Sequence, residues 1–200
     1  MGDPAAVRIG IFGGTFDPIH TAHLEVAEAV RERLGLDRML LMVASEPWQK
    51  VGARPLTPAE DRFAMVEAAA ADWPGLEPSR MEIDRGGPTY TIDTVRQLLD
   101  EEPGAEMTLV VGSDVVGGLT TWKDEAALQG AVTLAVVGRP GVDPVAPPPG
   151  WRTVQVPVAP FDVSSTELRR RLEAGLPVEG WVPEPVIRCI ARRGLYATGR

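Results

Sequence analysis

Short apolar runs alternate along the chain with segments whose hydrophobic residues recur every three or four positions. The runs RMLLMV, MTLVV and VTLAVV are almost entirely apolar, which is typical of strands covered on both faces of a parallel sheet. The periodic segments each have one apolar face and predict amphipathic helices. The predicted strands are Arg8–Gly13, Arg38–Val43, Arg80–Asp84, Met107–Val111, Val132–Val137 and Thr153–Val156.

Helix signals separate these strands. Two segments, TPAE at 57–60 and SSTE at 164–167, match the capping box, whose first and fourth residues bond to the first backbone N–H groups of a helix. Loops rich in Pro and Gly are predicted at Ala44–Leu56 and Pro140–Gly150. The predicted helices are His20–Leu34, Thr57 to about Ala71, Tyr90–Glu102, Ser164 to about Ala174, and Pro183–Arg193.

This alternation of strands and helices predicts an α/β fold: a doubly wound parallel sheet of Rossmann-like type. We expect a single domain over residues 1–200, with a C-terminal helical part at about 164–200. Ligands of such sheets bind beyond the carboxyl ends of the strands. Glycine, hydroxyl and charged residues follow the predicted strands at Gly13–Asp17, Ser45–Lys50, Gly86–Thr91, Gly112–Asp114, Gly138–Arg139 and Ser164–Thr166.

Composition narrows the classes of protein. With 44% hydrophobic and 24% charged residues among 200, the profile is that of a globular chain. No apolar run approaches the roughly 20 residues of a membrane helix, and the single cysteine suits a reducing compartment, so we expect a cytoplasmic protein without membrane contact. A net charge of −8 argues against nucleic acid as a partner, because the negatively charged phosphate backbone of a nucleic acid binds basic protein surfaces.

The only two histidines, His20 and His23, lie three positions apart just after the Gly13–Gly14 turn. Residues at this spacing share a helix face, and a helix N-terminus favours an anion, so the pair suggests a phosphate site. Two solvated helix residues are one alternative, and zinc bound by both histidines and Asp17 is the other. Helical zinc ligands more often have the spacing of HExxH, however, and Cys189 offers no thiolate cluster.

Two motifs carry a resemblance to a known superfamily. The segment GGTFDPIHTAH at 13–23 resembles the GGTFDPxHxGH signature of the HxGH nucleotidyltransferases, with Ala22 in the place of the second glycine of that signature's HxGH part. The segment VSSTELR at 163–169 resembles the ISSTxxR motif of the same proteins. Both segments are expected at a helix N-terminus, where hydroxyls and an arginine suit phosphate oxygens.

The middle of the chain resembles one branch of the superfamily, the bacterial nicotinate-nucleotide adenylyltransferases. The matching segments are GGPTYTIDT at 86–94, GSD at 112–114 followed by Thr121-Trp122, and EPWQK at 46–50, which is similar to actinobacterial members. The resemblance spans roughly Ile9 to Tyr196.

The resemblance implies condensation of ATP with nicotinate mononucleotide to deamido-NAD and pyrophosphate, a step of NAD biosynthesis, with Mg²⁺ carried by ATP. The mononucleotide phosphate would attack the α-phosphorus in line, without a covalent enzyme intermediate. It implies catalytic roles for His20 and His23. The implied ATP-binding residues are Gly13, Gly14, Thr15, Phe16, Ser164, Ser165, Thr166 and Arg169. The implied substrate-binding residues are Thr89, Tyr90, Thr91, Asp93, Gly112, Asp114, Trp122, Lys123, Arg139 and Lys50.

Several alternatives stay open at this point. Trp122 also suits core packing, and Lys50 and Arg139 also suit solvated surface positions. A sister adenylyltransferase could act on nicotinamide mononucleotide or pantetheine phosphate. The departure at Ala22 also allows a nucleotide-binding regulator without catalysis. The sequence leaves the oligomeric state open, a homo-oligomer included.

Overall fold

The computed structural model describes residues 6–46, 56–138, 146–159 and 162–197. Within these residues, six parallel strands form one sheet in the order β3-β2-β1-β4-β5-β6. The chain builds outward from β1 to β3 and then returns to place β4 on the other side of β1, so the strand order reverses between β1 and β4. The strands are β1 (Arg8–Gly14), β2 (Arg38–Val43), β3 (Leu76–Ser79), β4 (Glu106–Gly112), β5 (Val132–Val137) and β6 (Thr153–Val156).

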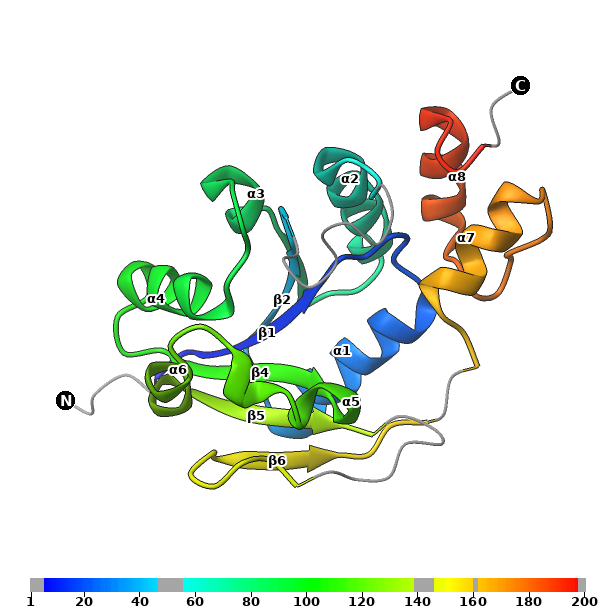
Figure 1. The fold of residues 1–200 in the computed structure, drawn as a ribbon. Coiled ribbons are helices and arrows are strands. Elements are labelled where there is room, and N and C mark those ends of the chain that lie inside the picture. Colours follow the sequence, from blue (N-terminus) through cyan, green and yellow to red (C-terminus); the bar gives the residue numbers. More distant parts are fainter. Residues whose placement is uncertain (1–5, 47–55, 139–145, 160–161, 198–200) are drawn as a thin grey trace.

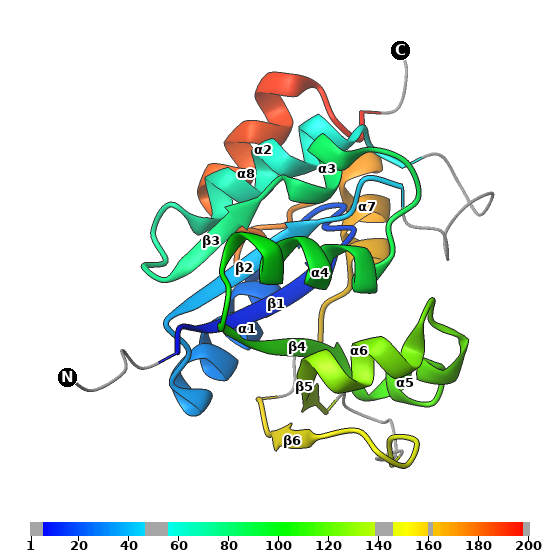
Figure 2. The same ribbon diagram turned by 90° about the vertical axis from the view of Figure 1, so that its left-hand side faces the viewer.

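Helices cover both faces of the sheet, as Figures 1 and 2 show. One core lies under α1, α2, α7 and α8, and the other under α4, α5 and α6. The helices are α1 (Thr21–Leu34), α2 (Ala59–Ala70), α3 (Met81–Arg85), α4 (Thr91–Glu101), α5 (Ser113–Val116), the 3₁₀ turn η2 (Leu119–Thr121), α6 (Glu125–Ala131), α7 (Ser165–Glu173) and α8 (Glu184–Arg193).

The buried strands explain why their sequences lack polar alternation. In β2, Met39, Leu41 and Val43 belong to the core on one face of the sheet. Leu40 and Met42 belong to the core on the other face. Successive side chains of a strand point to opposite faces, so every position of β2 after Arg38 must be apolar. The predicted doubly wound parallel sheet is confirmed.

Two local predictions are wrong. Residues 80–84 were expected as a strand, but α3 covers Met81–Arg85 and the third strand is the preceding Leu76–Ser79. This strand contains Pro78 and lacks an apolar run, which an edge strand tolerates because one side of its backbone has no partner. The capping box expected at Thr57 is not formed either, since Pro58 is the N-cap of α2 and no side chain caps it.

The connection from β4 to β5 also differs from the prediction, because α5, η2 and α6 lie there. None of the three exceeds seven residues, which is too short for a helical period to show in the sequence. Most of the predicted loops Ala44–Leu56 and Pro140–Gly150 lies outside the described residues. Among the residues that are described, no helix is long and apolar enough to cross a membrane.

Candidate active site

The two glycines after β1 have different tasks. A Cβ at Gly14 would lie 2.8 Å from the ring of Phe16, which is 2% exposed and has a left-handed backbone with φ of 49°. Gly14 is therefore needed so that Phe16 can pack. A Cβ at Gly13 would meet nothing within 4 Å. The open space that a phosphate would need therefore lies at Gly13, whereas the protein itself fills the space at Gly14.

His20 and His23 form the start of α1 in a way that differs from the predicted helical pair. His20 is the N-cap, with extended backbone, and His23 is the third helical residue. The backbone N–H of His20 donates to Nδ1 of His23 at 3.2 Å, and the two rings stack with centroids 3.7 Å apart. Because Nδ1 accepts this bond, the neutral His23 ring carries its proton on Nε2. That Nε2–H can donate to an anion.

Aromatic side chains fix the position of the imidazole pair. The ring of Phe16 meets His23 edge to face at a centroid distance of 5.2 Å, and Phe12 of β1 lies 6.1 Å from the same ring. His20 is buried, with 5% of its surface exposed, and Ala22 beside it is buried as well. The expectation that both imidazoles lie on the same side is confirmed. The cause is not two helical positions three residues apart, as predicted, but the N-cap position of His20 and the stacking of the two rings.

The zinc alternative finds no support in this geometry. Asp17, the third member of that set, directs a carboxylate oxygen to the hydroxyl of Tyr196 at 2.6 Å. The described parts of the chain place no group of three or more His, Cys, Asp and Glu side chains where they could hold a metal ion.

Residues from the far end of the chain join this loop at the start of α7. Ser164 is the N-cap of α7, and its Oγ accepts the N–H of Glu167 at 3.3 Å, which is one half of the predicted capping box. The carboxylate of Glu167, which would form the other half, binds Arg170. Ser165 donates its hydroxyl to the carbonyl of Pro18 at 3.1 Å. A serine hydroxyl has one proton, so in this conformation Ser165 cannot also donate to a phosphate. Its observed task is to join the two motifs.

Arg169 makes the second link between the motifs. Its Nη1 donates to the carbonyl of Asp17 at 2.7 Å, and its Nη2 donates to Oγ1 of Thr166 at 3.1 Å. Since Thr166 accepts this bond, its own proton is directed elsewhere and suits a phosphate oxygen. The starts of α1 and α7 meet at this loop, as Figure 1 shows. The structure therefore brings the two motifs together.

A buried arginine that the sequence analysis does not single out connects the loop to β2. Arg62 of α2 is 1% exposed, and it donates to the carbonyls of Thr15, Ser45 and Thr57 at 2.9, 3.0 and 2.8 Å. One guanidinium therefore holds together the chain segments that follow β1 and β2 and that precede α2. A lone arginine in an amphipathic helix gives no sequence signal for this role.

The segment before α4 also returns to the carboxyl end of β2. Thr89 donates its backbone N–H to the carbonyl of Glu46 at 3.1 Å, and its Oγ1 accepts the N–H of Ser45 at 3.1 Å. Glu82 of α3 is buried and accepts the hydroxyl of Thr94 at 2.6 Å. Burial raises the pKa of the Glu82 carboxyl above its ordinary value, and hydrogen bonds from Thr94 and Thr89 and the charge of Arg85 offset this rise only in part. The two hydrogen bonds of Thr89, to Ser45 and to Glu46, therefore hold the segment before α4 against the end of β2.

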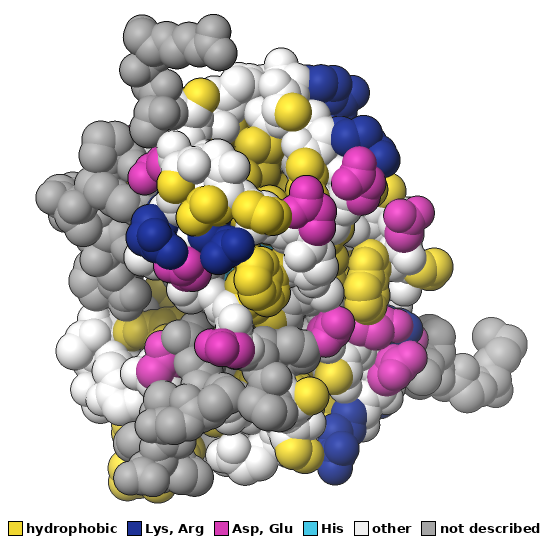
Figure 3. Space-filling view, turned by 90° about the vertical axis from the view of Figure 1, so that its right-hand side faces the viewer, with side chains coloured by type: hydrophobic (Ala, Val, Ile, Leu, Met, Phe, Trp, Pro, Cys, Tyr) yellow, Lys and Arg dark blue, Asp and Glu magenta, His cyan; other side chains and the backbone are white. Residues whose placement is uncertain are grey.

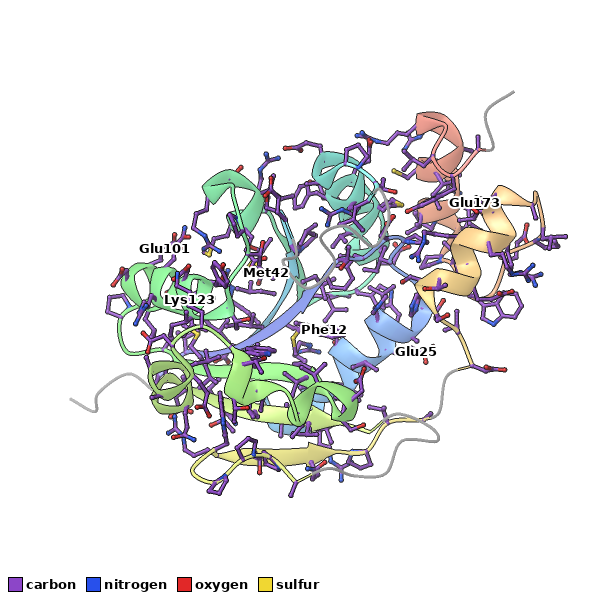
Figure 4. All side chains as sticks on the ribbon, viewed as in Figure 1. Phe12, Glu25, Met42, Glu101, Lys123 and Glu173 are labelled. Carbon is purple, nitrogen blue, oxygen red and sulfur yellow. The ribbon has the colours of Figure 1, made fainter. Side chains whose placement is uncertain are left out.

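Three predicted substrate residues form one cluster at the start of α4. Lys123 binds both carboxylate oxygens of Asp93, at 3.0 and 2.7 Å, and its Nζ lies 4.6 Å from the ring centroid of Tyr90. Figure 4 shows Lys123 beside α4, whereas Phe12, which lies next to His23, is on β1. The Lys123 cluster and the histidine pair therefore lie on different elements. These residues satisfy one another's charge in this structure, and their contact with substrate stays a prediction.

The remaining predicted residues lie near the same sheet edge or outside the described chain. Thr91 is the first residue of α4, Gly112 is the last residue of β4, and Asp114 is the second residue of α5. Trp122 packs partly against the second core, and its backbone N–H donates to the carbonyl of Leu119 at 3.0 Å. Lys50 and Arg139 fall outside the described residues.

Comparison with known proteins agrees with this geometry. The family model described as cytidylyltransferase-like matches residues 11–171. This span runs from within β1 to within α7 and contains the histidine pair and the other five strands of the sheet. The fold and site therefore define a nucleotidyltransferase.

Individual relatives narrow the class. A protein of Corynebacterium kroppenstedtii named as a probable nicotinate-nucleotide adenylyltransferase is 42% identical over 192 residues, covering 94% of this chain and 90% of the relative. A Thermus thermophilus protein of the same name is 43% identical over 195 residues, covering 95% and 100%. The chain belongs to the nicotinate-nucleotide adenylyltransferase family.

A solved structure supports the fold. The nicotinic acid mononucleotide adenylyltransferase of Plasmodium falciparum, complexed with NaAD, aligns with a TM-score of 0.77. The alignment covers 94% of this chain and 97% of that one at 17% identity. The two chains therefore share an architecture despite little sequence likeness.

The different surroundings of Gly13 and Gly14 give a matched pair of variants. Gly14→Ala should lower the free energy of unfolding by about 1–3 kcal/mol, because the new methyl overlaps the Phe16 ring. Gly13→Ala should keep the stability of the parent, because its methyl meets no protein atom, and should raise the KM for ATP if a phosphate occupies this open space. Urea denaturation and steady-state kinetics measure both effects. Equal losses of stability in the two variants would contradict the assignment.

Proposed function

We propose that the protein transfers the adenylyl group of ATP to the 5′-phosphate of nicotinate mononucleotide, which yields deamido-NAD and pyrophosphate. The observation that carries this proposal is the stacked His20–His23 pair at the junction of α1 and α7. Membership of the nicotinate-nucleotide adenylyltransferase family supports it, and favours it over a sister enzyme or a regulator without catalysis.

The junction concentrates positive potential in an acidic chain. The N-terminus of each helix carries about half a positive charge and several backbone N–H groups without an intrahelical partner. The starts of α1 and α7 flank one loop, and the Arg169 guanidinium is held beside it. Acidic and basic side chains are mixed on the described part of the face that carries α7 and α8 (Figure 3). A triphosphate fits the local charge at the junction, although the chain as a whole has a net charge of −8.

The reaction asks the protein for position and charge stabilisation. An oxygen of the mononucleotide phosphate forms a bond to the α-phosphorus while the bond from that phosphorus to the pyrophosphate oxygen breaks. The Nε2–H of His23 is oriented by the hydrogen bond at Nδ1 and would donate to the phosphate oxygens as their charge changes. No protein nucleophile is required, because the substrate phosphate attacks directly.

The groups around the proposed phosphate site favour Mg²⁺ bound to the substrate over Mg²⁺ bound to the protein. Imidazole, guanidinium and hydroxyl groups surround the phosphate site, whereas Mg²⁺ prefers carboxylates, water and phosphate oxygens. The carboxylate of Asp17 is already bonded to Tyr196. We propose that Mg²⁺ is held by the phosphates of ATP, where it would neutralise charge on the leaving pyrophosphate.

The mononucleotide is expected on the other side of the carboxyl edge, near α4. The first residue of this helix, Thr91, contributes a backbone N–H of the kind that receives a carboxylate at a helix N-terminus. Trp122 is partly exposed nearby and offers a ring for stacking on the pyridine.

Pyrophosphate release from ATP, tested with nicotinate mononucleotide, nicotinamide mononucleotide and pantetheine phosphate, distinguishes the candidate functions. The cytoplasmic location expected from the sequence stays a prediction.

Substitution of either histidine tests the proposed chemistry. His20→Ala or His23→Ala should lower kcat by about 10²–10³, the usual cost of losing one donor to a transition state. The His23 variant should also lose about 1 kcal/mol of stability, because Nδ1 no longer accepts the His20 amide. His23→Asn keeps a side-chain acceptor, so it should recover stability without recovering kcat. A kcat within a few-fold of the parent for either alanine variant would refute the assignment.

Selectivity tests the site near α4. A carboxylate accepts charge-assisted hydrogen bonds, which are roughly twice as strong as neutral ones, whereas a carboxamide directs its NH₂ at groups that are already donors. We expect kcat/KM for nicotinate mononucleotide to exceed that for nicotinamide mononucleotide at least tenfold, a difference of about 1.4 kcal/mol. Both values are measured at saturating ATP. Equal values would show that the carboxylate is not recognised in this way.

A further inference from the structure

A tyrosine near the end of the chain reaches the loop that carries the histidines. The hydroxyl of Tyr196 donates to Oδ1 of Asp17 at 2.6 Å, across 179 positions of sequence. Asp17 is 1% exposed and stands three residues before His20. The chemistry proposed above uses neither Tyr196 nor the Asp17 carboxylate, so this buried contact needs another explanation.

The end of α8 directs Tyr196 inward. Gly194 ends the helix in the left-handed region with φ of 63°, and the N–H of Leu195 returns to the carbonyl of Ile190 at 3.1 Å. Tyr196 itself has φ of 58°, and its ring packs against the core under α1 and α2. Burial, together with the hydrogen bond to Asp17, raises the pKa of the Tyr196 hydroxyl, so it stays a proton donor at neutral pH.

Asp17 is held from two sides by different groups. Its carboxylate accepts the Tyr196 hydroxyl, and its backbone carbonyl accepts Nη1 of Arg169. A buried carboxylate is costly unless hydrogen bonds satisfy it. The Tyr196 contact therefore fixes the side chain of Asp17, and with it the backbone that leads through Pro18 to the N-cap histidine.

We propose that Tyr196 is a positioning residue for adenylyl transfer, acting through Asp17 to hold His20 and His23 in the geometry that faces the transferring phosphate. This inference rests on the proposed function, because it adds a residue to the same site. The segment after α8, which carries Tyr196, would then contribute to the geometry of that site.

The test compares two variants that each remove one tether of the same chain end. Tyr196→Phe removes the hydroxyl that reaches Asp17 and that also lies 3.8 Å from Sδ of Met65, and it keeps the ring. Arg193→Gln removes the ion pair of Arg193 with Asp61 of α2, at 2.6 Å, and leaves Asp17 untouched. We expect Tyr196→Phe to lower kcat about tenfold with the KM for nicotinate mononucleotide within twofold of the parent. Arg193→Gln should keep kcat within twofold.

A second readout does not depend on turnover. Native-state hydrogen exchange of the His20 and His23 amides should be faster in Tyr196→Phe and unchanged in Arg193→Gln, because only the first contact holds the loop. If the parent protein releases no pyrophosphate, the proposed function is rejected. The exchange comparison still tests whether Tyr196 holds the loop, because it needs no turnover. Parental kcat and exchange in Tyr196→Phe would overturn the positioning role. Equal loss of kcat in both variants would also overturn it, since general tethering of α8 would then be the cause.

Discussion

Side chains from distant parts of the sequence bind the backbone carbonyl groups of the loop at 15–18. The donors are Arg62 of α2, and Ser165 and Arg169 of α7. A buried carbonyl that loses its donor costs about 1–3 kcal/mol, so the loop can adopt this conformation only when α2 and α7 are packed in place. The proposed phosphate site therefore forms with the tertiary structure as a whole.

The same loop determines the state of the imidazoles. It places the backbone N–H of His20 where Nδ1 of His23 can accept it, which leaves the proton of a neutral His23 ring on Nε2. The stack on His20 and the edge of Phe16 limit rotation of that ring. A donor fixed before substrate binds needs little reorganisation when charge develops on the phosphate, which is the basis of electrostatic catalysis.

The sequence predicts the sheet well because its central strands are apolar on both faces, as β2 and β5 show. It fails at β3, where an edge strand with Pro78 lacks that pattern. The histidines are found by their spacing, but the capping geometry that orients them is not. Arg62 and Tyr196 are missed because their partners in the loop lie 47 and 179 positions away, beyond any local pattern. The proposed substrate residues come from family resemblance, not from periodicity.

The most direct test is the protonation pattern of the two imidazoles, read by nitrogen-15 NMR of protein labelled at histidine. The chain has only two histidines, so each ring can be assigned by one substitution. At a pH where the rings are neutral, we predict that His23 carries its proton on Nε2 and that addition of ATP shifts this nitrogen. A proton on Nδ1 of His23, or rings that do not respond to ATP, would contradict the account.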